Sequence, residues 1–110
     1  MAGLLSLPTF MKAAKTKSKI GLQLYSLRDT IFQDPKGILQ KVAGFGYREI
    51  ETFAYGDGKI FGMPFKEFGS YVDSLGMKVC SGHYGLDLAK SDKWQQAVTD
   101  ARSVGQKFMV

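Results

Sequence analysis

One carboxylate and one imidazole hold comparable places in two successive parts of this sequence. Glu51 lies five residues after Gly46, and His83, the only histidine, lies seven residues after Gly76. Ser81, five residues after Gly76, is the counterpart of Glu51. A carboxylate near an imidazole can bind a metal ion, transfer protons or bind hydroxyl groups. These two residues alone do not distinguish between the three roles. A salt-bridged Glu51 and a structural or surface His83 stay open as alternatives.

The glycines that precede these residues belong to a repeating unit. Gly46, Gly76 and Gly105 each end an amphipathic stretch and precede a strand-like run, and they are 30 and 29 residues apart, about the length of one βαβ unit. We predict strands at 20–25, 48–53, 78–82 and from 108, and helices at 34–45, 64–75 and 91–104. The apolar residues expected to face inward from these helices are Ile38, Leu39, Val42, Phe45, Phe65, Phe68, Val72, Leu75, Trp94, Ala97, Val98, Ala101 and Val104. Gly69 interrupts the second helix at a cost of up to about 1 kcal/mol relative to alanine.

The order βαβαβαβ predicts an α/β fold with parallel strands and right-handed crossovers. A doubly wound sheet and a (β/α)8 TIM barrel both satisfy this order. Regular spacing favours the barrel, and so does the lack of a phosphate-binding glycine fingerprint after the first strand. Because a barrel takes about 250 residues, residues 20–110 are expected to form its N-terminal part, about three and a half βα units. Sites in this fold lie at the carboxyl ends of the strands, where Gln23 and Tyr25 would join Glu51 and His83.

The glycine-rich segment 54–63 is expected to be a loop at the same mouth. Its glycine spacing fits neither the dinucleotide nor the P-loop pattern, so a phosphate-binding role is excluded. We interpret it as a flexible loop whose Tyr55 and Phe61 stack on the apolar face of a sugar ring.

Residues 1–19 form a separate leader. A short apolar run with small residues after it resembles a secretory signal that lacks its positively charged start. Export, for example to the periplasm, is the favoured location; a disordered leader on a cytoplasmic protein is the alternative.

Of the net charge of +5, four charges come from Lys12, Lys15, Lys17 and Lys19, so the fold carries no basic face for nucleic acid. No segment is apolar over enough residues to span a membrane, and Cys80, the single cysteine, has no disulfide partner and is expected to be buried.

Three stretches of the chain resemble the xylose isomerase-like TIM barrels, which include sugar phosphate isomerases and epimerases. They are residues 20–29, residues 46–51 and residues 75–83. The resemblance implies a sugar or sugar derivative as substrate and a divalent metal (Mn, Mg, Zn or Co) at the barrel mouth. It implies catalytic roles for Glu51 and His83, and substrate contacts from Gln23, Tyr25 and Arg28. The family's metal ligands come from later strands that this chain does not contain. His83 is the one candidate ligand within it.

The resulting hypothesis is a fragment of a metal-dependent sugar (phosphate) isomerase or epimerase that transfers a proton next to a carbonyl. A non-catalytic remnant or carbohydrate-binding piece is the alternative, and we favour it for the 110 residues alone because their outer strands would be open edges. We expect the isolated chain to be inactive unless an oligomer completes it. A DNA-repair endonuclease related to endonuclease IV is disfavoured by the balanced charge after Ile20.

Overall fold

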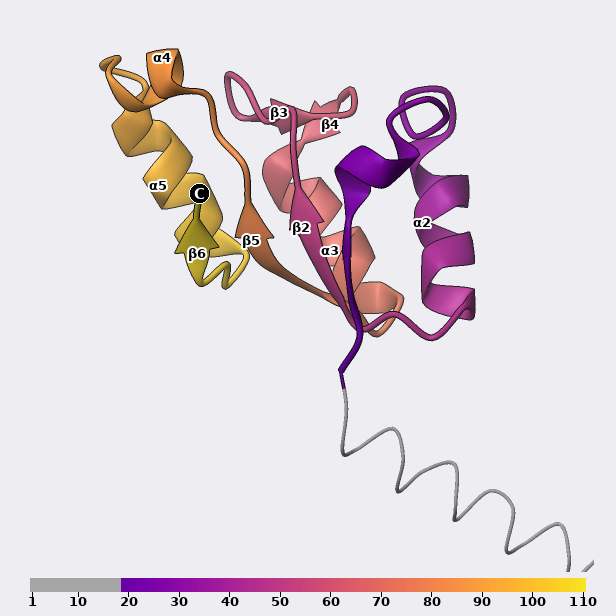
Figure 1. Ribbon diagram of the computed structural model, residues 1–110. Coiled ribbons are helices and arrows are strands. Elements are labelled where there is room, and N and C mark those ends of the chain that lie inside the picture. The colour runs from indigo at the N-terminus through magenta and orange to yellow at the C-terminus, as the bar shows by residue number, and fades with distance from the viewer. Residues whose placement is uncertain (1–18) are drawn as a thin grey trace, which may run out of the picture.

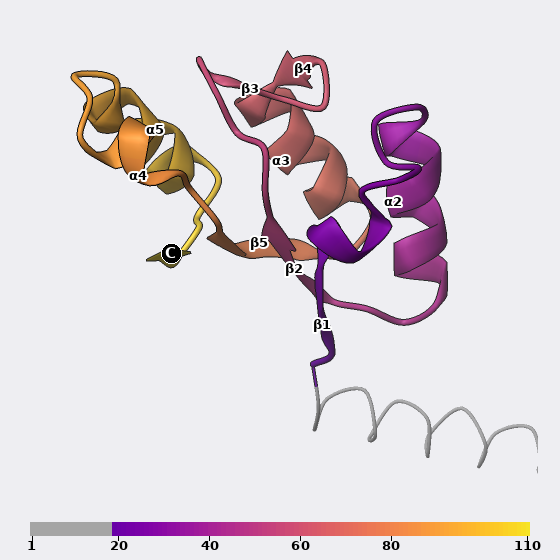
Figure 2. The ribbon, with the colours of Figure 1, turned by 45° about the horizontal axis from the view of Figure 1, so that its top comes forward.

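A parallel sheet with helices along one face forms the protein. The computed structural model describes residues 19–110, so the predicted leader falls, apart from Lys19, outside the described residues. Strands β1 (Gly21–Gln23), β2 (Glu49–Thr52), β5 (Lys78–Gly82) and β6 (Phe108–Met109) pair in parallel in the order β1-β2-β5-β6. Helices α2 (Pro35–Gly44), α3 (Phe65–Ser74) and α5 (Trp94–Ser103) connect them and lie on the same face of the sheet (Figures 1 and 2). This is the predicted alternation and the architecture of part of a TIM barrel.

The predicted start of the first helix is confirmed, whereas the helix ends one residue before the predicted end at Phe45. The Asp34 carboxylate accepts a hydrogen bond from the Gly37 backbone N–H at 3.1 Å, and Pro35 occupies the first helical position. Gly46 takes the left-handed conformation at φ 101° that ends the element. The inward position predicted for Phe45 is wrong. The helix ends at Gly44, so the helical period does not extend to Phe45, which is 80% exposed.

Three segments contain structure that differs from the prediction. The first strand ends at Gln23, because the next four residues form the 3-10 helix η1 (Leu24–Leu27). Tyr25 therefore does not lie on the strand. The segment 54–63 is not an open loop: it contains an antiparallel hairpin of β3 (Lys59–Ile60) and β4 (Met63–Pro64). A short helix, α4 (Leu86–Ala89), lies between β5 and α5, where the sequence pattern predicts no helix.

The core lies between the sheet and the helices, and Gly69 has a packing role in it. Leu39, Ile50, Phe65, Phe68 and Val72 are essentially fully buried there. A Cβ on Gly69 would lie 2.4 Å from Val104 Cγ1 at the end of α5, so the glycine lets α3 and α5 approach closely.

Trp94 and Cys80 are less buried than expected. Trp94 is half-buried, and its ring meets the Tyr84 ring edge-to-face at 5.5 Å. Cys80 is also half-buried, and its thiol donates a hydrogen bond to the Ile50 carbonyl at 3.4 Å. In the part of the chain that is described, no helix has the length and apolar character to cross a membrane.

Candidate functional site

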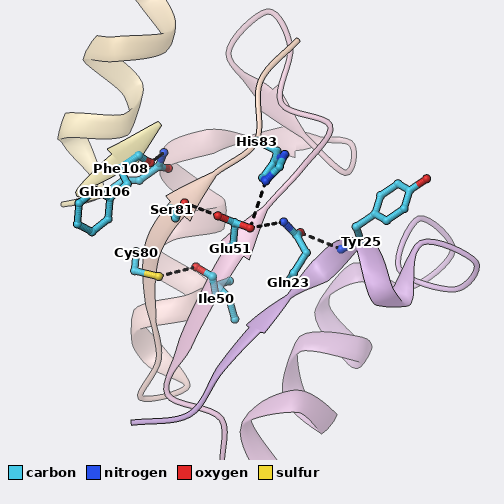
Figure 3. A network of polar contacts seen from close by, with 9 residues as sticks. All are labelled: Gln23, Tyr25, Ile50, Glu51, Cys80, Ser81, His83, Gln106 and Phe108. Atoms are coloured by element: carbon cyan, nitrogen blue, oxygen red, sulfur yellow. Dashed lines mark hydrogen bonds and ion pairs between the residues drawn. The ribbon is translucent and has the colours of Figure 1, made fainter. Parts of the chain in front are cut away.

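Three polar side chains lie level with one another across adjacent strands. Gln23 on β1 is in register with Glu51 on β2, and Glu51 is in register with Ser81 on β5. The second pairing depends on a shift of register: Ile50 pairs with Val79, the next pairing is Glu51 with Ser81, and Cys80 is passed over. Such an irregularity re-aims side chains near the end of a strand. Here it places Ser81 beside Glu51, as Figure 3 shows.

The Glu51 carboxylate is held by one neutral donor on each oxygen. The Gln23 side-chain amide donates to Glu51 Oε1 at 2.5 Å, and the Ser81 hydroxyl donates to Glu51 Oε2 at 2.5 Å. His83 Nε2 lies 3.5 Å from the same Oε1 atom. The Glu51 side chain is 26% exposed and that of His83 is 56% exposed. The carboxylate is therefore fixed in orientation, while the imidazole reaches it from the solvent side.

A pocket of about 390 Å³ opens over this pair and is lined by Gln23, Tyr25, Glu51, Phe53 and His83. Its volume lies in the range of small-molecule sites. Two aromatic rings and a carboxylate–imidazole pair around one cavity can bind a polyhydroxylated ligand and move a proton on it. The structure brings together four of the residues that the sequence singled out: Gln23, Tyr25, Glu51 and His83. Their individual roles stay predictions.

Gln23 uses both ends of its amide within the protein. While its nitrogen donates to Glu51, its carbonyl oxygen accepts a hydrogen bond from the Tyr25 backbone N–H at 3.0 Å. The side chain thus joins the first turn of η1 to the carboxylate. These contacts suit an orienting residue, in addition to the substrate contact that the resemblance implies.

Arg28, Tyr55 and Phe61 lie outside the lining of the pocket. The Arg28 guanidinium stacks 4.4 Å from the centre of the Tyr25 ring and donates to the Tyr25 carbonyl at 3.0 Å. The Tyr55 hydroxyl donates to Asp100 Oδ2 on α5 at 2.5 Å. Burial and this carboxylate raise the pKa of Tyr55 well above the ordinary tyrosine value. Phe61 is only 8% exposed. The sugar-stacking roles of Tyr55 and Phe61 remain predictions.

A second set of contacts connects the hairpin region to α5. The Lys93 ammonium lies 2.7 Å from Asp57 Oδ1, and a Cβ on Gly58 would lie 2.9 Å from the Gln96 side chain. The segment that follows β2 is therefore anchored to the helix of the next unit, through Tyr55 at one point and Asp57 at another.

The backbone that carries His83 is held from both sides. The His83 N–H donates to the Thr52 carbonyl at 2.9 Å, and the Gly82 carbonyl accepts from the Val110 N–H at 2.8 Å. Gly82 is required here, because a Cβ would lie 2.7 Å from Thr52 Oγ1 and 2.9 Å from the Tyr84 hydroxyl. The Tyr84 hydroxyl accepts a hydrogen bond from the Gln106 amide at 2.8 Å. Tyr84 and Gln106 are not predictable as partners from the sequence, since nothing in a local pattern links residues 22 positions apart.

The described residues do not by themselves make the metal site that the resemblance implies. Within residues 19–110, no three groups among His, Cys, Asp and Glu lie close enough together to hold a metal ion. Glu51 and His83 supply only two donors, and both oxygens of Glu51 already accept hydrogen bonds.

Comparison with solved structures identifies similar proteins. No family model matches the chain, and no curated protein matches it. A crystal structure of a sugar phosphate isomerase/epimerase from Parabacteroides distasonis is 27% identical over 83% of this chain, with a TM-score of 0.70. A second sugar phosphate isomerase/epimerase structure from the same organism is 28% identical over 83% of this chain, with a TM-score of 0.66. The chain spans 40% and 37% of the length of these two structures. The resemblance to this class of TIM barrels, predicted from three sequence stretches, is confirmed.

Proposed function

We propose that the chain forms the first strands of a metal-dependent sugar (phosphate) isomerase or epimerase, which acts by proton transfer next to a carbonyl. The observation that carries the proposal is the pairing of Glu51 with His83 over the 390 Å³ pocket at the strand ends. The similarity to two solved sugar phosphate isomerases/epimerases supports it. A small-molecule sugar or sugar derivative is the proposed partner.

Glu51 is the proposed base in this reaction. Its carboxylate takes the proton from the carbon next to the carbonyl, while Gln23 and Ser81 keep both oxygens in place. His83, 3.5 Å from the same carboxylate, gives a proton to the carbonyl oxygen, so that an enediol forms without net gain or loss of protons. Return of the proton to the other carbon gives an isomer, and return to the other face gives an epimer. The proposed metal needs ligands beyond those of residues 19–110, so no step is assigned to it.

Exchange of substrate hydrogen with solvent tests this assignment. The full-length protein is incubated in D2O with a panel of aldoses, ketoses and their phosphates, and deuterium uptake at carbon is followed by NMR. Loss of a positioned base costs about 10²- to 10⁴-fold, so Glu51→Gln is expected to reduce uptake by at least a hundredfold. Glu49→Gln is the matched control, because Glu49 lies on the same strand two residues before Glu51.

Equal uptake in the wild type and Glu51→Gln would refute the proposed role of Glu51. Sugar binding without any uptake in the wild type would instead support a carbohydrate-binding protein, a function that the aromatic walls of the pocket also suit. Calorimetric titration with the same panel distinguishes these outcomes.

A further inference from the structure

An aromatic ledge extends the pocket along the barrel mouth. We use this name for the rings of Tyr25, Phe53 and Phe32. Tyr25 and Phe53 line the pocket, and their ring centroids lie 5.2 Å apart at an angle of 84°. Phe32 lies beyond the pocket lining and meets Phe53 edge-to-face at 5.7 Å. Tyr25 is 52% exposed and Phe32 is 55% exposed in the described part of the chain. The ledge therefore presents apolar surface that begins inside the pocket and continues outside it.

The rings of the ledge are supported from behind. Phe32 and Phe53 both pack edge-to-face on Phe61, at 5.3 and 5.4 Å. Phe61 is buried at the turn of the hairpin, where its backbone takes a left-handed conformation at φ 49°, and it packs in turn on Phe68 of α3. A non-glycine residue is held in that conformation only by its surroundings. The hairpin thus places Phe61 as a support for the exposed ring of Phe32 and the half-buried ring of Phe53.

The position of Tyr25 is fixed by contacts other than those with Phe61. Its backbone N–H donates to the Gln23 side chain, its carbonyl accepts from Arg28, and the Arg28 guanidinium covers its ring. Exposed aromatic surface that is held in place next to a polar pocket is typical of binding sites rather than of ordinary protein surface. The pocket lining contains a carboxylate with an imidazole and two aromatic rings, and one further ring lies next to these rings outside the lining. A ligand that fits this arrangement has hydroxyl groups at one end and an apolar face along its length.

We propose that the ledge is a subsite for a second sugar ring, so that the favoured ligands are disaccharides or glycosides rather than single sugars. The hydroxyl groups of the first ring meet Glu51 and His83, and the C–H face of the second ring packs on Phe32 and Phe53. The inference rests on the proposed sugar-binding function and adds the size of the ligand to it. Pyranose rings offer one face of C–H groups, which matches the apolar faces of aromatic side chains.

A binding experiment with matched probes tests the subsite without requiring turnover. Cellobiose and glucose are titrated by calorimetry into the full-length wild type, Phe32→Ala and Phe32→Tyr. One aromatic contact changes an affinity by about two- to tenfold. We expect tighter binding of cellobiose than of glucose by the wild type, a loss of about that factor for cellobiose in Phe32→Ala, unchanged glucose binding, and restored cellobiose binding in Phe32→Tyr.

Phe45→Ala is the control, because Phe45 is 80% exposed and lines a different pocket, with Ile20 and Tyr47. It should leave both affinities unchanged. Equal losses for glucose and cellobiose in Phe32→Ala, or no loss for either, would overturn the subsite. The proton-transfer function is judged separately by deuterium uptake: uptake without a preference for cellobiose refutes the ledge alone, and a Phe32-dependent preference without uptake refutes the isomerase reaction alone.

Discussion

Replacing Gly69 with alanine should destabilise the protein, although the same change inside a helix usually stabilises it. Alanine gains about 1 kcal/mol over glycine from helix propensity. The new Cβ, however, would lie 2.4 Å from Val104 Cγ1 and 2.9 Å from Val104 Cβ. Rotation of the Val104 side chain moves Cγ1 but not Cβ, so the backbones of α3 and α5 must separate. Overpacking of this kind costs about 1–3 kcal/mol. The net expectation for Gly69→Ala is a loss of about 0–2 kcal/mol in the free energy of unfolding.

Urea unfolding of four variants, Gly69→Ala, Gly44→Ala, Val104→Ala and the double variant Gly69→Ala/Val104→Ala, measures this balance. Gly44→Ala is the control, since Gly44 is the last residue of α2 and a Cβ there meets nothing within 4 Å. It should raise the free energy of unfolding by up to about 1 kcal/mol. In the Val104→Ala background the Gly69→Ala change should cost less than in the wild type, with a coupling of about 0.5–3 kcal/mol. A Gly69→Ala protein as stabilised as Gly44→Ala would refute the close contact between the two helices.

Three further predictions concern the site and its surroundings. Gln23→Leu removes a hydrogen bond to a carboxylate, a contact of about 1.5–3 kcal/mol, and should lower deuterium uptake by about ten- to a hundredfold; unchanged uptake would contradict the orienting role. Gly82→Ala should cost about 1–3 kcal/mol in urea unfolding because its Cβ meets Thr52 Oγ1, whereas Gly85→Ala, with open space, should not. The raised pKa of Tyr55 means that the unfolded chain loses this proton first. The contribution of Tyr55 to the free energy of unfolding is therefore fully present below pH 10 and is lost as the pH rises above it. Tyr55→Phe should weaken this decline in stability, as measured by unfolding curves recorded at pH 8 and pH 11.

Local sequence patterns predicted most helices and strands, and the equal distance from the preceding glycine predicted that Glu51 and Ser81 occupy equivalent positions in the site. Asp34 with Pro35 marked the start of a helix, and β5 has the predicted bounds, Lys78–Gly82. Glu51 and Ser81 share a place in the repeat, and they lie side by side in the sheet. These successes depend on interactions between residues that are close in sequence or related by the repeat.

Contacts between distant residues account for most of what was missed. The sequence predicts Tyr55 in a loop that contacts substrate, yet its hydroxyl bonds to Asp100, 45 positions away, and no pattern in either segment indicates that pairing. The hairpin needs left-handed backbone at Phe61, a conformation that few non-glycine residues take and that sequence alone does not announce. The sequence does not predict a site role for Phe32, because a single aromatic residue in a loop shows no periodic pattern.

The polar contacts between the hairpin region and α5 determine which segment of this chain can be exchanged with another barrel. In a repeating α/β protein each strand and its helix could in principle be exchanged as one module. Here the segment after β2 ends on the helix of the following module, through Tyr55 with Asp100 and Asp57 with Lys93. A transplanted second module would carry Tyr55 and Asp57 without their partners. Residues 49–103 therefore form the smallest segment that could be grafted onto another barrel with this side of the mouth intact.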